Sequence, residues 1–232
     1  MAMIEASTGE KVTGRASAAS RPTVNSTSSP CPACAGTRLR PEALAVTWHG
    51  HRIVDLAAGE QLDPAYRAIN PGCTVPTLVL DDGTVLGDNA AITAWAEAVH
   101  PEPPLLGRTA VEKAEVASWN AKLEAECFMA IAEVLRNTAP AMKGRALPGP
   151  QDYAQIPELA ERGRARLIHF LDRFEEHMQH REWVAGSAFS LADITAAVAL
   201  DFAGWVKVDV NASRPAIAAW RAKMAARPSF AL

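Results

Sequence analysis

Apolar residues recur at helical spacing through most of the second half of the chain. Between Thr109 and about residue 137, every third or fourth residue is apolar, which indicates one buried helix face. The residues on this face are Val116, Trp119, Leu123, Cys127, Ile131 and Leu135. Thr109 and Glu112 have the spacing of a capping box, so the helix is predicted to begin at Thr109.

Three further helices are predicted after this one. The first covers about residues 157–181, and the apolar positions on its predicted buried side are Leu167, Phe170, Leu171, Phe174 and Met178. The second begins at another capping box, Ser190 with Asp193, and is apolar nearly all round, which is typical of a helix at the centre of a bundle. Capping explains Asp193, whereas Asp201 is predicted to be a buried charge without an obvious role.

The last predicted helix has Pro215 in its first turn and ends before Pro228. Residues 109–232 are therefore predicted to form an all-helical domain.

Before His100 the pattern becomes partly strand-like. "TVPTLVL" (74–80) is β-rich and apolar, Asp82-Gly83 is a strong signal for a two-residue hairpin turn, and "TVLG" (84–87) is the returning strand. Upstream, "HRIVDL" (51–56) predicts a strand and "LDPAYRAIN" (62–70) a short helix.

A helix is predicted directly after the hairpin, and Asp88 and Asn89 stand at its start. Asp and Asn are preferred helix N-caps, and the free N–H groups of a helix start favour a bound anion.

Pro76 restricts the chain just before the hairpin. It cannot donate a hydrogen bond, and it forces Val75 to be extended. If the Val75–Pro76 bond is cis, Val75 offers its N–H and C=O outward, and an extended peptide could pair with it as an added strand. About 5–6% of X–Pro bonds in folded proteins are cis, so the residues alone favour trans.

Composition and charge exclude several classes of function. The chain has 232 residues with a net charge of −3, and its Lys and Arg residues are dispersed, so nucleic-acid binding is not expected. No apolar run is long enough to span a bilayer and no signal peptide is visible, so we expect a cytoplasmic protein without a membrane partner. Four cysteines are too few for a disulfide scaffold and indicate buried or reactive thiols.

The order of these segments predicts the domain organisation. Residues 1–27 are rich in Ser, Thr, Ala and Gly and predict a flexible tail. A compact domain follows over 28–99, and the Pro-rich "HPEPPLLG" predicts a linker over 100–108. His177 and His180 are three residues apart on a helix, but two ligands do not make a metal site, so no metal is expected.

Several of these motifs, in this order, resemble the soluble glutathione transferases. The Val-Pro pair before a hairpin, followed by an acidic and a polar residue that open a helix, resembles the glutathione-binding half of that family. "FSLADITAAVALDFAGWV" (189–206) resembles its buried capping-box helix, and "AAWRAKMAARPSF" (218–230) its C-terminal helix. The resemblance covers about Ile53 to the C-terminus. It implies a two-domain α+β fold, with a thioredoxin-like N-terminal domain of mixed sheet and helices and an all-α C-terminal bundle.

The resemblance also implies a ligand and its site. It implies that the Val75–Pro76 bond is cis and that the segment Thr74–Pro76 pairs with the cysteinyl backbone of glutathione. Asp88 and Asn89 would hold the γ-glutamyl ammonium and carboxylate. The implied activity is a glutathione transferase that activates the thiol for attack on an electrophilic small molecule, and the implied assembly is a homodimer.

The chain departs from the family pattern in three places. Asp88-Asn89 stands where the family usually has Glu-Ser, and Cys73 stands where it usually has Gly; a packed thiol is the simpler interpretation of Cys73. The first strand is also poor in the segment "TVNSTSS", and Pro41 interrupts the helix that should follow.

Candidate catalytic residues fall in that divergent segment. "CPAC" contributes Cys31 and Cys34, and a thiol at a helix N-terminus has a lowered pKa. A thioredoxin-like register favours Cys31 as nucleophile, whereas counting back from Arg38 in a transferase register favours Cys34. Ser28 or Ser29 could instead supply the hydroxyl that hydrogen-bonds a glutathione thiolate.

Two other functions remain open at this point. One is a glutathione-dependent thiol–disulfide oxidoreductase that uses Cys31 and Cys34. The other is a non-catalytic adaptor that kept the transferase fold.

Overall fold

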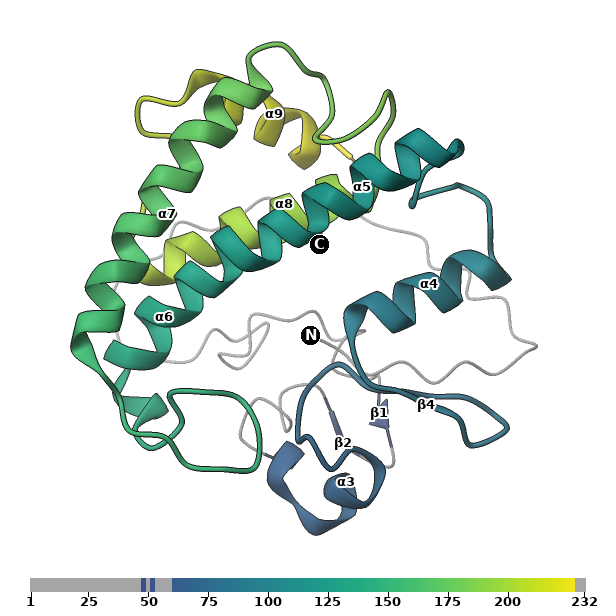
Figure 1. The fold of residues 1–232 in the computed structure, drawn as a ribbon, viewed down its shortest axis with the longest axis vertical. Helices are drawn as coiled ribbons and strands as arrows, with labels where there is room; N and C mark the ends of the chain where they lie inside the picture. Colours follow the sequence, from purple (N-terminus) through teal and green to yellow (C-terminus); the bar gives the residue numbers. More distant parts are fainter. Residues whose placement is uncertain (1–46, 49–50, 53–59, 228–232) are drawn as a thin grey trace, which may run out of the picture. The chain divides into compact units, whose positions relative to one another are not determined.

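The computed structural model describes residues 47–48, 51–52 and 60–227 (Figure 1). The chain divides into two compact units, the first ending at Ile92 and the second beginning at Thr93. The predicted tail, residues 1–27, lies outside the described residues. Within them, no helix is long and apolar enough to cross a membrane.

The first unit contains two short hairpins and a short helix. Strands β1 (Thr47–Trp48) and β2 (His51–Arg52) pair antiparallel. The 3₁₀ turn η1 (Glu60–Leu62) leads into α3 (Pro64–Ile69), which confirms the predicted short helix. Its remaining elements are the strands β3 (Leu78–Val79) and β4 (Val85–Leu86), which pair antiparallel, and the start of helix α4 (Asn89–Val99).

The hairpin is confirmed, but its turn is one residue longer than predicted. Leu78 pairs with Leu86 and Val79 with Val85, and the N–H of Leu80 donates to the C=O of Thr84 at 2.9 Å. Three residues, 81–83, therefore form the loop. Gly83 has φ = +85°, and its N–H donates to the C=O of Leu80 at 2.9 Å, the arrangement of a type I turn followed by a left-handed glycine. The Asp-Gly pair correctly located the turn but not its length.

The second unit is helical, as predicted. Helices α5 (Ala110–Lys122) and α6 (Met129–Thr138) are joined by a π-helical segment, η2 (Leu123–Phe128), into one long rod (Figure 1). After the 3₁₀ turn η3 (Pro140–Met142) come α7 (Pro157–Met178) and α8 (Leu191–Ala203). The 3₁₀ turn η4 (Gly204–Val206) and α9 (Pro215–Ala225) complete the unit.

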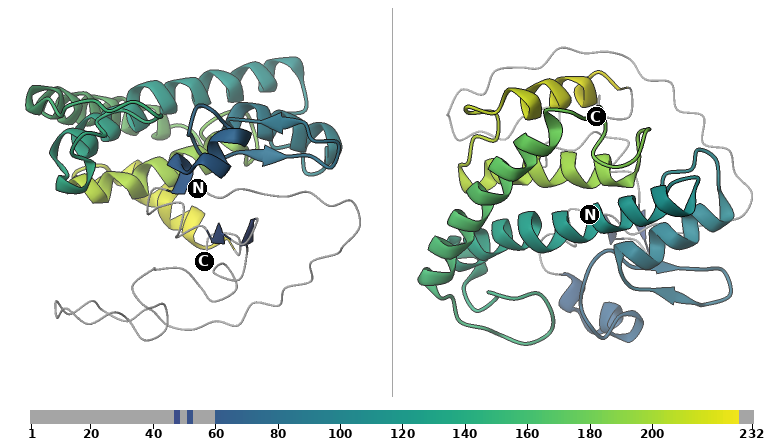
Figure 2. Two further views of the ribbon diagram at one scale, coloured as in Figure 1. Left: turned by 90° about the horizontal axis from the view of Figure 1, so that it is seen from below. Right: turned by 45° about the horizontal axis from the view of Figure 1, so that its top comes forward.

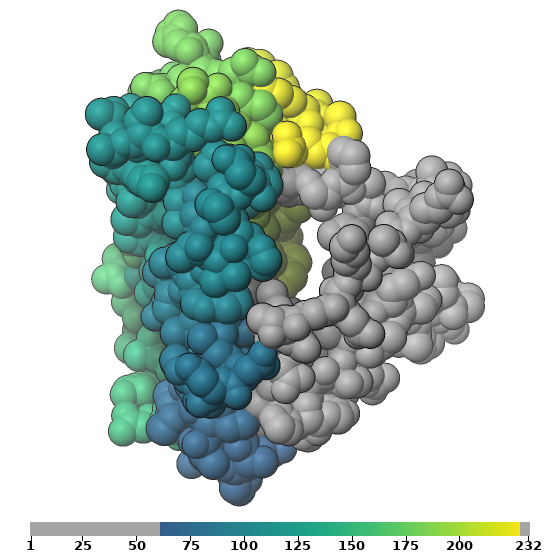
Figure 3. Space-filling model, turned by 90° about the vertical axis from the view of Figure 1, so that its right-hand side faces the viewer, coloured from purple at the N-terminus to yellow at the C-terminus, as the bar shows by residue number. Residues whose placement is uncertain are grey.

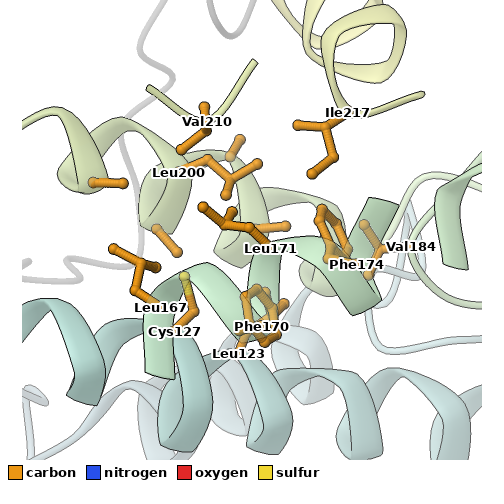
Figure 4. Packing of buried hydrophobic residues seen from close by; sticks show 14 of the residues in the cluster. Leu123, Cys127, Leu167, Phe170, Leu171, Phe174, Val184, Leu200, Val210 and Ile217 are labelled. Carbon is orange, nitrogen blue, oxygen red and sulfur yellow. The ribbon is translucent and has the colours of Figure 1, made fainter. Parts of the chain in front are cut away.

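These helices pack around one apolar core. Helix α6 packs on α7, α5 on α8 and α7 on α9, and α8 lies between the α5–α6 rod and α9 in the right-hand view of Figure 2. Figure 4 shows Leu123 and Cys127 of the rod facing the side chains of α7. All five residues predicted for the buried side of α7 are buried, as are Val116, Leu123, Cys127 and Ile131 of the rod; Trp119 and Leu135 are partly buried.

The π-helical segment was not predicted, because one extra residue in a turn barely alters the apolar spacing. It changes which backbone groups are paired. The guanidinium of Arg166 in α7 donates to the C=O of Ala125 at 2.7 Å. Close packing nearby requires Gly163, since a Cβ there would lie 2.7 Å from the C=O of Ala130.

A buried carboxylate ties α8 to two other parts of the unit. Asp193 is fully buried, and its Oδ2 accepts hydrogen bonds from the N–H of Ser190 at 3.0 Å and from its hydroxyl at 3.2 Å. Its Oδ1 accepts from the N–H of Val184 at 3.0 Å and from the indole Nε1 of Trp220 at 3.1 Å. Burial raises the pKa of Asp193, and these four donors oppose the shift. Asp193 is thus a cap, as predicted, and also joins α8 to α9.

Cationic side chains at the C-terminal end of α9 contact aromatic rings. The ammonium of Lys223 lies 3.4 Å from the ring centre of Trp183, and the guanidinium of Arg227 lies 3.6 Å from that of Phe189. Figure 3 shows the yellow atoms of α9 beside the light-green segment that precedes α8. Cation–π contacts therefore hold the C-terminal helix to this segment.

Asp201 is not the buried charge that the sequence predicted. It is exposed and forms an ion pair with Arg221. Helix α8 is buried over most of its circumference but leaves a strip exposed that includes Asp201 and Val198, the latter 37% exposed. Apolar neighbours in the sequence did not reveal this strip, because Ala is common on both sides of the helix.

We expect Asp193→Ala to lower the free energy of unfolding by about 3–4 kcal/mol, since buried donors lose a charged acceptor. Asp201→Ala is the matched control on the same helix and should cost less than about 1 kcal/mol, because its ion pair is exposed. Urea unfolding followed by tryptophan fluorescence would measure both. Equal stability of the two variants would contradict the role assigned to Asp193.

Candidate active site

The loop between α3 and β3, residues 70–77, is built on tight local contacts. The N–H of Cys73 donates to the C=O of Asn70 at 3.0 Å, and Cys73 has φ = +51°, in the left-handed region that favours glycine. Its side chain is buried and its thiol lies 3.7 Å from the C=O of Pro71. This confirms the interpretation of Cys73 as a packed thiol, and the positive φ shows why glycine suits this position.

Three polar side chains converge on the carbonyl of Thr74. The hydroxyl of Tyr66 donates to it, Nδ2 of Asn70 donates at 3.0 Å, and the hydroxyl of Thr77 lies 3.3 Å away. Tyr66 and Thr77 are buried, at 3% and 1% exposure. Their hydroxyl oxygens are 2.9 Å apart, so the cluster is one connected network.

Val75 presents its backbone at the surface. The Val75–Pro76 bond is cis, as the resemblance to the transferases implies, and the side chain of Val75 is 37% exposed. Among the described residues, neither its N–H nor its C=O has a hydrogen-bond partner. The strand pairing of β3 begins only at Leu78, so Val75 is an open stretch of backbone just before the hairpin.

Asp88 and Asn89 stand at the start of α4. Oδ1 of Asp88 accepts from the N–H of Ala91 at 2.7 Å, so Asp88 is the N-cap, as predicted, and it is exposed. Asn89 is the first helical residue and is half-buried. No partner for Oδ2 of Asp88 is found in the part of the chain that the structure describes, so this oxygen can accept a further hydrogen bond.

The hairpin register brings the two halves of the candidate site together. Leu78 pairs with Leu86, so Pro76 and Asp88 each lie two residues beyond the last observed pair of the hairpin. An open backbone edge, a carboxylate and a helix N-terminus therefore flank the same end of one hairpin. Such a set can bind an extended peptide that carries both an ammonium and a carboxylate group.

The predicted catalytic residues Ser29, Cys31 and Cys34 lie outside the described residues. Of the four cysteines in the chain, the structure describes Cys73 and Cys127, and both are buried and free. Burial raises the pKa of the Cys127 thiol to about 12, so it stays protonated at neutral pH. Neither described thiol has the exposure of a nucleophile.

His177, named above as a possible metal ligand, has another role. Its Nε2 lies 2.9 Å from the C=O of Val184, and its ring packs against Trp119 at an angle of 37°, with ring centres 4.0 Å apart. Desolvation lowers its pKa, which favours the neutral ring. No cluster of three or more metal-ligating side chains occurs within the described ranges.

The network behind the carbonyl of Thr74 was not predicted from the sequence. Thr77 stands in an otherwise apolar strand, and a polar residue at a buried strand position was the one available signal. Tyr66 lies on a short helix whose pattern is too brief to separate buried from exposed positions. Asn70 resembles an ordinary turn residue before proline.

Comparison with known proteins identifies related sequences and folds. A family model described as "Glutathione S-transferase, N-terminal domain" matches residues 30–99, and one described as "Glutathione S-transferase, C-terminal domain" matches residues 129–228. Glutathione S-transferase 2 of Saccharomyces cerevisiae is 34% identical over 177 residues, which cover 76% of this chain and 73% of that protein.

Solved structures agree with the sequence matches. The crystal structure of Gtt2 from Saccharomyces cerevisiae has a TM-score of 0.69 and 33% identity, covering 78% of this chain and 84% of that one. A sphingomonad glutathione S-transferase complexed with glutathione has a TM-score of 0.58 and 26% identity, covering 71% of this chain and 74% of that one. The predicted fold class, a thioredoxin-like domain followed by a helical domain, is confirmed.

Burial of the two described thiols predicts their reactivity. In the native protein, Cys73 and Cys127 should resist alkylation by iodoacetamide at pH 8 over minutes, and both should react fully in denaturant. Peptide mass spectrometry would give the labelled fraction at each cysteine. Fast labelling of Cys127 in the native state would contradict its burial in the helical core.

Proposed function

This chain belongs to the glutathione S-transferase family, and from that premise we propose that it binds glutathione at the Thr74–Pro76 loop and the start of α4. Its reaction is attack of the glutathione thiolate on an electrophilic small molecule. We also propose domain limits of 28–99 and 109–232, joined by a linker over 100–108, and assembly as a homodimer.

The open backbone of Val75 is the observation that carries this proposal. An extended residue directs its N–H and C=O to the same side, so Val75 can exchange two hydrogen bonds with the cysteinyl residue of glutathione. Among the described residues these groups have no partner, so binding breaks no hydrogen bond within that part of the chain. The tripeptide thus adds a short antiparallel strand at Thr74–Pro76.

The γ-glutamyl end of the ligand fits the start of α4. Its carboxylate lies toward the positive end of the helix dipole, beside Asn89. Its ammonium meets Oδ2 of Asp88, while Oδ1 of the same residue stays bound to the N–H of Ala91. Asp88 can therefore cap the helix and bind ligand at the same time.

Thiol activation is assigned to residues ahead of the described part of the chain. The hydroxyl of Ser29 donates a hydrogen bond to the thiolate and so lowers the pKa of the thiol. The sulfur gives its electron pair to the electrophilic carbon, the leaving group departs with its bonding pair, and the thiol proton passes to solvent.

A second candidate function is glutathione-dependent disulfide reduction by Cys31 and Cys34. The burial of Cys73 and Cys127 favours it, because the remaining two cysteines of the chain form the C-x-x-C motif. One thiolate attacks the substrate disulfide, the second resolves the mixed disulfide, and two molecules of glutathione restore the dithiol as they become oxidised to their disulfide.

We expect Asp88→Asn to raise the dissociation constant for glutathione about tenfold, because an amide can cap the helix but does not pair with the ammonium. Isothermal titration with reduced glutathione would measure it. Asp82→Asn in the exposed hairpin turn is the matched control and should bind like the wild type. If the wild type shows no heat of binding and no retention on immobilised glutathione, the adaptor function is the better description.

Substitution of the candidate catalytic residues separates the two enzyme functions. If Ser29 activates the thiol, Cys31→Ala/Cys34→Ala should keep the conjugation of glutathione to chlorodinitrobenzene, and Ser29→Ala should lower it at least about 100-fold. If the cysteines are catalytic, the double variant should lose reduction of a hydroxyethyl disulfide and Ser29→Ala should keep it. Loss of conjugation in the double variant would contradict the serine mechanism.

A further inference from the structure

We infer that Tyr66 is a positioning residue for the proposed glutathione site. Its hydroxyl, in a buried network with Asn70 and Thr77, fixes the direction of the backbone that receives the ligand. Tyr66 does not face the open backbone of Val75, since its hydroxyl donates to the carbonyl on the other side of the Thr74–Val75 peptide group. The inference rests on the proposed function.

The amide of Asn70 sets the direction of every hydrogen bond in this network. Its Oδ1 accepts from the N–H of Gly72 at 3.0 Å, so the opposite atom must be the nitrogen. The two amide protons then go to the C=O of Thr74 at 3.0 Å and to the hydroxyl oxygen of Thr77 at 2.9 Å. Asn70 thus uses both of its donors.

The two hydroxyl protons follow from this assignment. Tyr66 donates to the C=O of Thr74, and Thr77, whose oxygen already accepts from Asn70, donates to the oxygen of Tyr66 at 2.9 Å. The carbonyl of Thr74 then accepts two hydrogen bonds, one for each lone pair. The 3.3 Å contact from Thr77 to the same carbonyl is the longer alternative.

Because the peptide group is planar, fixing the carbonyl of Thr74 also fixes the direction of the N–H of Val75. The C=O of Thr74 and the N–H of Val75 belong to one planar group, and in a trans peptide they point in opposite directions. The structure has this bond trans. Since the carbonyl is held toward buried Tyr66 and Thr77, the N–H of Val75 points away from them. An extended Val75 then directs its own C=O to the same side.

Burial strengthens the constraint that the side chains of Tyr66, Asn70 and Thr77 place on the carbonyl of Thr74. We call this set of three side chains the clamp. Tyr66 is 3% exposed and Thr77 is 1% exposed, and hydrogen bonds shielded from water hold their geometry better than exposed ones. If the clamp loosens, the peptide group of Val75 samples orientations that cannot pair with glutathione, and ordering it lowers the affinity. We expect the chemical step to be unaffected, because Tyr66 and Thr77 are buried and act on the ligand only through the backbone.

Tyr66→Phe is the direct test. Removal of one donor to Thr74 should raise the dissociation constant for glutathione about fivefold and raise the KM for glutathione by the same factor. The kcat at saturating glutathione should stay within about twofold of the wild type. The chain has two tyrosines, and Tyr153→Phe is the matched control, since Tyr153 is exposed and its hydroxyl donates only to Gln151.

Thr77 supplies a rescue and a coupling test. Thr77→Val removes the hydroxyl at nearly constant shape and should weaken binding, whereas Thr77→Ser should restore it. After Tyr66→Phe, the Thr77 proton can turn to the carbonyl of Thr74 at 3.3 Å, which limits the loss. The double variant Tyr66→Phe/Thr77→Val should therefore bind more weakly than the two single effects predict.

A readout without ligand separates this inference from the proposed function. In the free protein, Tyr66→Phe should speed amide hydrogen exchange in residues 72–77 at least threefold and leave exchange in α7 unchanged. A wild type that does not bind glutathione would overturn the proposed function, and the exchange data would still test the clamp. Unchanged affinity and unchanged exchange in Tyr66→Phe would overturn the inference itself.

Discussion

The backbone carbonyl of Thr74 is turned inward and held there by hydrogen bonds, and the candidate site depends on this constraint. A buried carbonyl must find donors, and here they are the hydroxyl of Tyr66 on α3 and the amide of Asn70 just after it, while Thr77, just before β3, donates to the hydroxyl of Tyr66. Because a peptide group is rigid, satisfying its inner half directs its outer half to the surface. The side chains that satisfy the buried carbonyl of Thr74 thus also orient the N–H of Val75 so that it can pair with a ligand.

The helical unit shows the same principle at its centre. Asp193 is a fully buried carboxylate that accepts four hydrogen bonds from three separate segments, the start of α8, the segment before it and α9. Apolar contacts alone tolerate small sliding of one helix on another, whereas a charged acceptor with fixed donors specifies one arrangement. In both units, a few buried polar groups determine geometry that apolar packing leaves less defined.

Much of the fold could be predicted because its signals are local. The buried face of α7, the capping boxes at Thr109 and Ser190 and the hairpin around Gly83 each depend on a few neighbouring residues, and the structure confirms all four. Three features escaped prediction. The hairpin loop has one more residue than its Asp-Gly pair suggested, the long rod contains a π-helical segment, and Asp201 is exposed. Each depends on hydrogen bonds or burial that residue spacing does not encode.

For the candidate site, local sequence was enough to identify the residues at a helix start and the backbone that precedes a proline. These are properties of Asp88, Asn89 and Val75 that follow from side-chain chemistry and local backbone restriction. The convergence of Tyr66, Asn70 and Thr77 on one carbonyl, in contrast, is a property of the folded chain. Their meeting requires α3, the turn after it and the segment that leads into β3 to fold against one another. The spacing of residues along the chain does not encode such contacts between separate segments.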